Sequence, residues 1–230
     1  MVAMGARKPK RLASAAAFVA IGVTAAVAAA ASIVIVYQNN FSSTGRGHQL
    51  TGVQSKHCNK RAVKGSLTVD IKSGPVVCGY KLPVEGSGRQ PKQDLEADFK
   101  LTKQTPPTLR KHTYFGLRMR ANGSKKYYEF RVFPKHGKYG IKRVPNGAGF
   151  PVGGTSNKIK PVGHWNTVQM RIFGHHLQAW VNGKKLADLN DKSPGDVPGA
   201  QLQVIAANGK HSHNTAVVQI DNLRVSVPKP

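Results

Sequence analysis

Two hydrophobic patterns divide this sequence. Residues 12–37 form one apolar stretch without a charged side chain. Beyond residue 37 the apolar residues come in short alternating runs separated by Gly, Pro, Asn and Asp, and none of these runs keeps a helical period over three turns. The pattern therefore predicts one long apolar helix followed by an all-β part.

The alternating runs predict strands that bury one face. In residues 94–101, apolar side chains occupy the odd positions and charged ones the even positions. Residues 114–120, 126–133 and 165–173 alternate in the same way, which is typical of a sheet with one face in the core. The positions expected to face the core are Leu95, Ala97, Phe99, Leu101, Phe115, Leu117, Met119, Tyr128, Phe130, Val132, Val168, Met170 and Ile172.

A hairpin signal and the absence of crossover helices decide the fold class. Residues 176–181 run into Asn182-Gly183, which favours a type I′ turn, and residues 184–187 return. Two further runs, 202–206 and 216–225, complete the set. About ten strands without crossover helices predict antiparallel sheets that form a sandwich or a barrel.

The apolar stretch is long enough to cross a membrane. Its 26 residues would span about 39 Å as a helix, against a hydrocarbon core of about 30 Å. Four basic residues precede it and should stay in the cytoplasm, which places the remainder outside the cell. These residues are Arg7, Lys8, Lys10 and Arg11.

A cleaved signal peptide is the alternative to an uncleaved anchor. The small residues 28–31 resemble a cleavage site, but residues 33–36 continue the apolar stretch and would leave an apolar stub after cleavage. We therefore expect a single-pass cell-membrane protein with a cytoplasmic amino terminus. The expected parts are a basic tail (1–11), a transmembrane anchor (12–37), an extracytoplasmic linker (38–64) and a β-sandwich domain (65–230).

Cys58 and Cys78 are the only cysteines, which excludes a disulfide-rich scaffold. In an oxidising compartment neither has another partner, so we expect a disulfide between them rather than two separate thiols. Two cysteines do not make a zinc site, and the spacing of His48 and His57 does not complete one.

The succession of strands resembles a known superfamily. The resemblance rests on the alternating run 94–101, Tyr128-Glu-Phe-Arg-Val and Trp165-Asn-Thr-Val. Its most specific parts are the Val181-Asn-Gly-Lys hairpin and the closing Asp221-Asn-Leu-Arg-Val. Over residues 65–227 the chain resembles the concanavalin A-like (laminin G-like) lectin/glucanase superfamily, including bacterial domains related to keto-disaccharide hydrolases. The resemblance implies a jelly-roll sandwich of two antiparallel sheets, whose concave face or rim loops often bind carbohydrate.

Glucanases of this superfamily use carboxylates spaced along one strand, so Asp94, Glu96 and Asp98 are the catalytic candidates. The backbones of Asp94 and Asp98 should lie about 13 Å apart, since residues two apart are about 6.6 Å apart along a strand. A retaining glycosidase holds its carboxyl groups about 5 Å apart and an inverting one up to about 9.5 Å. The glucanase order, Glu at both ends and Asp between, is also reversed here. We expect no catalysis, and the alternative is a glycoside hydrolase built around Glu96.

No metal or cofactor is expected. The histidine pairs His175-His176 and His211-Ser-His213 have no carboxylate pattern beside them and are interpreted as loop residues. The alternative is Ca²⁺, for which one oxygen-rich loop offers ligands. That loop contains Asn190, Asp191 and Asp196. The sequence has no phosphate-binding loop, dinucleotide fingerprint or nucleophile elbow.

Charge indicates the class of partner. The formal net charge is +25, from 35 Lys and Arg against 10 Asp and Glu, and such an imbalance attracts polyanions. Outside the cell a glycan or an anionic envelope polymer is expected as the partner, and nucleic acid is not. A second alternative is a structural module that binds an acidic protein.

A carbohydrate-binding face should combine aromatic and hydrogen-bonding side chains opposite the buried positions. Strand parity gives eight candidates, of which Trp180 is the most informative because its indole is costly to leave in water. The candidates are Tyr114, Arg118, Glu129, Arg131, Gln169, Arg171, Gln178 and Trp180.

Overall fold

The computed structural model describes most of the chain beyond the apolar stretch. Within the described residues no helix has the length and apolarity needed to cross a membrane. The only helix there is the short α1 (Pro107–Arg110). The described ranges are 33–42, 50–52, 56–72, 74–84, 92–122, 125–145, 151–193, 199 and 201–228.

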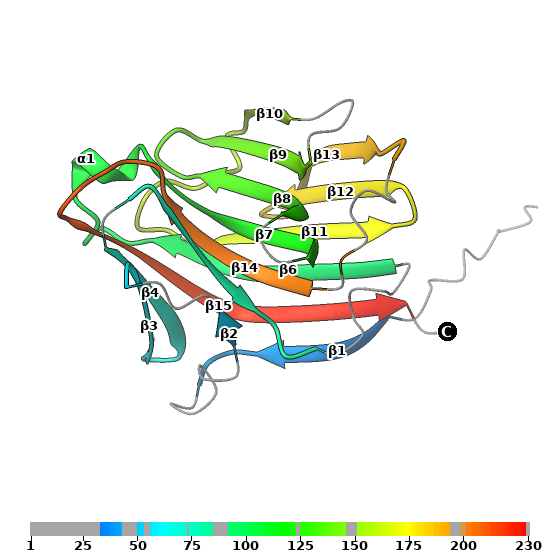
Figure 1. Cartoon of the computed structure of the whole chain (residues 1–230), viewed down its shortest axis with the longest axis horizontal. Coiled ribbons are helices and arrows are strands. Elements are labelled where there is room, and N and C mark those ends of the chain that lie inside the picture. The colour runs from blue at the N-terminus through cyan, green and yellow to red at the C-terminus, as the bar shows by residue number, and fades with distance from the viewer. Residues whose placement is uncertain are drawn as a thin grey trace, which may run out of the picture. The chain divides into compact units, whose positions relative to one another are not determined.

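These residues form a sandwich of two antiparallel sheets, shown in Figure 1. Sheet A runs in the order β13 (Lys184–Asn190), β12 (His176–Val181), β11 (Asn166–Phe173), β6 (Lys92–Leu101), β15 (Thr215–Pro228), β4 (Ser66–Lys72) and β3 (Cys58–Val63), with β1 (Ile33–Asn39) also paired to β15. Sheet B runs in the order β10 (Val152–Thr155), β9 (Lys138–Val144), β8 (Lys126–Phe133), β7 (Thr113–Asn122), β14 (Gln201–Asn208), β5 (Val76–Lys81) and β2 (Thr51–Gly52). The predicted all-β, jelly-roll-like architecture is confirmed.

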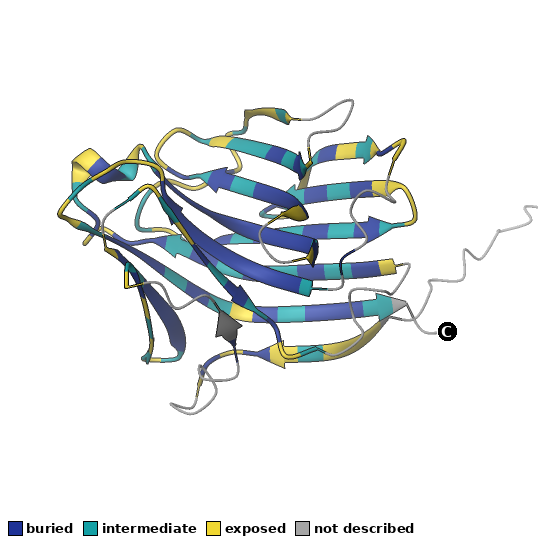
Figure 2. Ribbon diagram, in the orientation of Figure 1, coloured by how far each residue is buried: buried dark blue, intermediate teal, exposed yellow. Residues whose placement is uncertain are grey.

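The core lies between the sheets and consists of the predicted positions. On β6, Leu95, Ala97, Phe99 and Leu101 are each 0 % exposed. The predicted core positions of β7, β8 and β11 are buried as well. Phe99 of sheet A stacks on Phe115 of sheet B with ring centroids 5.0 Å apart. Figure 2 shows the resulting alternation of buried and half-buried residues along β6 and β11.

The predicted hairpin between β12 and β13 is present. Asn182 and Gly183 both have positive φ, 50° and 76°, as a type I′ turn requires. The Asn182 side chain also serves the neighbouring strand, because its Oδ1 accepts a hydrogen bond from the Thr167 amide at 2.9 Å. The turn is therefore bound to β11 as well as to its own strands.

The amino-terminal boundary of the sandwich differs from the sequence prediction. Residues 33–37, expected at the end of the transmembrane helix, belong to β1, which pairs antiparallel with β15. Part of the expected linker 38–64 also lies in the sheets, because it contains β2 and β3. Branched residues favour strands, and β15 offers a free edge for them. Residues 12–32 of the expected anchor lie outside the described residues.

The predicted disulfide joins Cys58 to Cys78 and connects the two sheets. Cys58 begins β3 of sheet A and Cys78 lies in β5 of sheet B, 20 residues later. Cys78 is fully buried and Cys58 is 9 % exposed. The bond therefore lies within the core and fastens β3 of sheet A to β5 of sheet B.

Replacing both cysteines tests this contribution. We expect Cys58→Ser with Cys78→Ser to lower the free energy of unfolding by about 3 kcal/mol, because a loop of this length is no longer closed in the unfolded chain. Urea unfolding followed by circular dichroism measures the change, and reduced wild-type protein should unfold like the double variant. An unchanged free energy would show that the bond contributes nothing.

Candidate functional site

The outer face of sheet B carries a row of polar side chains that crosses five strands. Strand pairing aligns Lys142 of β9, Glu129 of β8, Arg118 of β7, Gln203 of β14 and Lys81 of β5. Although these side chains point away from the core, Glu129 is 0 %, Gln203 5 % and Arg118 8 % exposed. Burial of outward-facing polar groups distinguishes this surface from an ordinary solvated face.

Glu129 is the centre of this row. Its carboxylate accepts hydrogen bonds from Arg118 Nε and Arg131 Nε, one on each oxygen, and Lys142 Nζ lies 3.8 Å from Oε1. The parity of β8 places residues 129 and 131 on one face, and Arg118 is opposite Glu129 in the register. A buried carboxylate needs such partners, because an unpaired buried charge is strongly unfavourable.

Two tyrosine rings contact the cations around Glu129. The Arg118 guanidinium lies 4.2 Å from the centroid of the Tyr127 ring, and Lys142 Nζ lies 5.2 Å from the same centroid. The Arg131 guanidinium lies 5.0 Å from the Tyr114 ring centroid. These distances are those of cation–π contacts, so each cation is held by a carboxylate and by an aromatic face. We call Tyr114, Arg118, Tyr127, Glu129 and Arg131 the sheet B patch.

Burial keeps the Tyr114 phenol neutral. Desolvation, with a smaller contribution from the charge of Glu129, raises the pKa of Tyr114 to about 12, and Arg131 and Arg118 oppose that shift. Tyr114 also packs against Phe133 with ring centroids 5.1 Å apart. With Ile205 and Ala207 the two rings form an apolar cluster on the outer face of sheet B, separate from the main core.

Glycines surround Arg131 in the sheet. Arg131 pairs with Gly116 on β7 and with Gly140 on β9, so no side chain stands directly beside it on either neighbouring strand. Gly116 has no room for one, because a Cβ there would lie 1.8 Å from the Phe130 carbonyl oxygen. The Arg131 side chain is 28 % exposed, and its terminal nitrogens make no hydrogen bond within the described part of the chain. They can therefore bind an incoming acceptor.

The charge balance of the patch is positive. Of the carboxylates in the described ranges, Glu129 alone lies on a strand of sheet B, and Arg118, Arg131 and Lys142 surround it. Guanidinium groups bind carboxylate and sulfate in planar, bidentate geometry. The arrangement can therefore bind one anionic group on cations that are already positioned.

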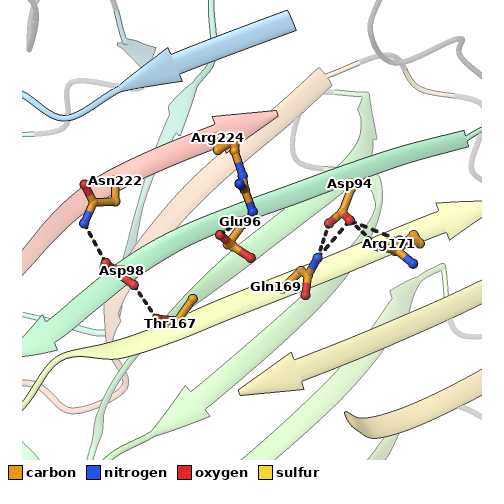
Figure 3. Close-up of polar contacts among 8 residues, drawn as sticks. All are labelled: Asp94, Glu96, Asp98, Thr167, Gln169, Arg171, Asn222 and Arg224. Carbon is orange, nitrogen blue, oxygen red and sulfur yellow. Dashed lines mark hydrogen bonds and ion pairs between the residues drawn. The ribbon is translucent and has the colours of Figure 1, made fainter. Parts of the chain in front are cut away.

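The carboxylates of β6 lie on the outer face of sheet A, as Figure 3 shows. Asp94 accepts hydrogen bonds from Gln169 Nε2 and from the Arg171 guanidinium, whose Nη2 lies 2.6 Å away. Glu96 accepts one from Arg224 Nη2 at 2.8 Å. Asp98 has two donors of its own: the Thr167 hydroxyl at 2.6 Å and Asn222 Nδ2 at 2.8 Å. Each carboxylate therefore has its own donors on a neighbouring strand.

Glu96 differs from its neighbours in its pKa. Burial raises the pKa of Glu96, the Arg224 cation opposes this, and the charges of Asp94 and Asp98 raise it further. A carboxyl group with a raised pKa is the type of group that serves as a general acid. This shift is the one feature of β6 that favours the catalytic alternative.

The eight predicted ligand-binding residues do not form one face. Tyr114, Arg118, Glu129 and Arg131 lie together on sheet B, whereas Gln169, Arg171, Gln178 and Trp180 lie on sheet A. Members of the second group already have protein partners: the Arg171 guanidinium lies 5.2 Å from the Trp180 ring centroid, and Gln178 Nε2 donates to Asp188 at 2.9 Å. Alternation shows which residues point outward, but not which sheet a strand joins.

Tyr127 and Lys142 belong to the site and were not predicted. Tyr127 has the same parity as Glu129 and Arg131, so the strand pattern contained the signal that could have identified it. Lys142 contacts Glu129 through the β8–β9 register, which only strand pairing reveals. Gln203 of β14 lies opposite Arg118 in the β7–β14 register, which strand pairing likewise reveals.

Five histidines line two hollows at the surface. His57, His211 and His213 line one of about 600 Å³, and His175 and His176 line another of about 550 Å³. In the ranges that the structure describes, no three His, Cys, Asp or Glu side chains are placed to hold a metal ion.

The candidate calcium loop is partly described. The buried carboxylate of Asp191 accepts hydrogen bonds from the Tyr128 hydroxyl and the Ser193 amide, and Arg143 Nε lies 3.1 Å from it. Asp196 lies outside the described residues. Both oxygens of Asp191 therefore already have protein partners.

Comparison with known proteins places the chain in a family. Residues 63–226 match the model of the 3-keto-alpha-glucoside-1,2-lyase-like domain. The chain belongs to this family. The match covers nearly the same residues as the resemblance seen in the sequence, and it confirms the concanavalin A-like superfamily. No curated protein matches the chain in sequence.

Solved structures share the fold of this lyase-like domain at low identity. A carbohydrate-binding module, CBM66 from Bacillus subtilis, is 13 % identical with a TM-score of 0.56, covering 78 % of this chain and 96 % of that one. SCLam, a non-specific endo-beta-1,3(4)-glucanase of family GH16, is 12 % identical with a TM-score of 0.61, covering 86 % and 92 %. A galectin-like protein of unknown function from Bacillus subtilis is 10 % identical with a TM-score of 0.61, covering 85 % and 98 %.

Neutralising Glu129 should destabilise the domain. We expect Glu129→Gln to lower the free energy of unfolding by about 3–5 kcal/mol, because Arg118 and Arg131 lose the charge that compensates them. The control Asp188→Asn breaks an exposed pair with Lys185, and its unfolding midpoint should stay close to wild type. Urea unfolding measures both, and equal effects in the two variants would contradict a special role for Glu129.

The buried tyrosines should make stability fall at alkaline pH. Burial raises the pKa of Tyr80 and of Tyr114 to about 12, above the ordinary value of about 10. The folded state therefore keeps these protons where the unfolded state loses them, and their stabilising contribution, complete below pH about 10, is lost as pH rises through about 12. Unfolding free energies from pH 8 to 12 should fall less steeply in Tyr114→Phe, and an unchanged slope would contradict the shift.

Proposed function

We propose that the sheet B patch binds a carbohydrate that carries carboxylate or sulfate groups. The observation that carries this proposal is the buried Glu129, which fixes Arg118 and Arg131 over tyrosine rings and leaves the terminal nitrogens of Arg131 without a partner in the described part of the chain. Cations held in place before binding lose little conformational entropy when a ligand arrives. Membership of a family named for a glucoside-acting lyase, and a fold shared with a carbohydrate-binding module, support a glycan as the ligand.

Binding without cleavage fits the carboxylates of sheet B best. A glycosidase needs two carboxyl groups on either side of the scissile bond, and a lyase needs a free base to remove a proton. On the described strands of sheet B the only carboxylate is Glu129, which is fully buried and paired with three cations. The patch therefore offers anion recognition rather than acid–base chemistry.

The membrane anchor remains part of the proposal. With residues 33–37 assigned to β1, the apolar residues 12–32 would still span about 31 Å as a helix, close to the hydrocarbon thickness of about 30 Å. The Cys58–Cys78 bond supports an oxidising compartment. We therefore propose that the sandwich faces the outside of the cell.

Binding assays with a matched pair of variants test the function. Arg131 and Arg171 are half-buried arginines, each paired with a carboxylate and lying over an aromatic ring, but they lie on different sheets. Arg131→Gln should weaken binding to polygalacturonate about tenfold or more, because a hydrogen bond to a charged group contributes about 1.5–3 kcal/mol. Arg171→Gln should bind like wild type, and neutral dextran should not bind.

Two outcomes would contradict this assignment. If Arg171→Gln abolished binding and Arg131→Gln did not, the ligand would bind sheet A. If wild-type protein bound an acidic protein such as polyglutamate as tightly as polygalacturonate, the patch would recognise charge without sugar, as the alternative of an acidic protein partner requires. Binding should also weaken in 0.5 M salt, because screening reduces attraction between exposed charges.

The hydrolase alternative has its own test. The raised pKa of Glu96 favours it, so β-glucan and polygalacturonate should be incubated with the protein and assayed for new reducing ends. We expect no turnover. Turnover that persists in Arg131→Gln and is lost in Glu96→Gln would assign catalysis to β6 and overturn the non-catalytic proposal.

A further inference from the structure

Strand β1 exposes a run of apolar side chains. Val34, Ile35 and Val36 are 39 %, 49 % and 43 % exposed, and among the described residues only Val77 is a comparably exposed large apolar residue. Successive residues of a regular strand point to opposite faces, so Val34 and Ile35 leave both faces of β1 uncovered at this end, and Val36 follows at the register shift between Ile35 and Tyr37. Single exposed apolar residues are normal in proteins, whereas three in succession indicate contact with a partner.

The edge of β1 has little protection as well. Within the described part of the chain β1 pairs only with β15, so its other edge has no strand beside it, as Figures 1 and 2 show. Proteins usually protect such edges with lysine, proline or a bulge that turns the edge away. Ile33–Asn39 contains neither lysine nor proline, and its one protective feature is a register shift of the bulge type between Ile35 and Tyr37. An apolar edge with so little protection is prone to aggregate unless something covers it.

The sequence directly before β1 indicates what covers its exposed apolar residues. Residues 12–32 are apolar and uncharged, and no charged residue or loop sequence separates them from Ile33. If these residues cross the bilayer, a strand advances only about 3.3 Å per residue after leaving it. Val34 would then lie at most about 7 Å and Val36 at most about 13 Å from the exit point. A strand that runs along the membrane surface therefore keeps all three residues in the headgroup layer, which is about 5–8 Å thick on each side of the bilayer.

We infer that Val34, Ile35 and Val36 lie in the headgroup region of the membrane that the chain's own anchor crosses, so that the sandwich rests on the bilayer without a free linker. This inference rests on the anchor of the proposed function. The unpaired backbone groups of the β1 edge exclude the hydrocarbon centre, because they must bind water or lipid headgroups. The occupant is thus the phospholipid interface, and pairing with a second copy of the chain is the competing outcome.

Depth-dependent quenching tests this contact. The full-length chain is reconstituted in phosphatidylcholine liposomes with a fluorescent label on Val36→Cys, or on the control Val77→Cys, with the Cys58–Cys78 bond kept oxidised. Val77 is 37 % exposed and lies on sheet B, so its exposure matches that of Val36. The label at 36 should lose about half or more of its fluorescence to a headgroup nitroxide lipid and much less to a nitroxide near the acyl-chain end, as expected of interfacial residues. The label at 77 should lose little to either.

Each result decides the question. If the label at 36 behaves like the label at 77 while the chain resists extraction by alkaline carbonate, the anchor stands and the docking of β1 is overturned. If carbonate extracts the chain, the anchor and the docking both fail, whereas glycan binding by the sheet B patch is unaffected. The label at 36 could instead be shielded from water without being quenched by either nitroxide lipid. If this shielding also increases with the protein density in the liposomes, a second copy of the chain covers β1 and the lipid contact is overturned.

Discussion

The sheet B patch depends on one buried carboxylate. Glu129 is the only acidic side chain on the described strands of sheet B, and it compensates Arg118, Arg131 and Lys142 at a position without solvent. Without it, the guanidinium groups would repel one another over the tyrosine rings, and the row across β9, β8, β7 and β14 would lose its order. The same ion cluster therefore stabilises this face of the domain and holds its cations in the positions on which the proposed binding of an anionic ligand depends.

The two outer faces of the sandwich carry similar charged residues but differ in charge balance. On sheet A the carboxylates of β6 each have their own donors on β11 or β15: Asp94 pairs with the Arg171 cation and Glu96 with the Arg224 cation, whereas Asp98 accepts from the neutral side chains of Thr167 and Asn222. On sheet B one carboxylate serves three cations, and a positive surplus remains. This surplus lies beside aromatic rings and glycines, and on this ground we propose an acidic glycan as the ligand of the sheet B patch.

The sequence predicted the layers well and the site only in part. Strict alternation on β6, β7, β8 and β11 identified the core, since each strand has one buried face, and the Asn182-Gly183 turn and the cysteine pair were recognisable locally. Parity could not assign strands to sheets, so Arg131 and Arg171 were grouped although they lie in different sheets. The start of the domain was misplaced because residues 33–36 extend an apolar stretch and are also good strand formers, and only pairing with β15 decides between these roles.

The most direct measurement of the central claim is the nuclear magnetic resonance signal of the arginine Nε–H groups during titration with galacturonate oligomers. Specific binding by the sheet B patch predicts that the signals of Arg118 and Arg131 shift together and saturate, while those of Arg171 and Arg224 stay in place. Shifts confined to Arg171 and Arg224, or equal small shifts of all four, would contradict it.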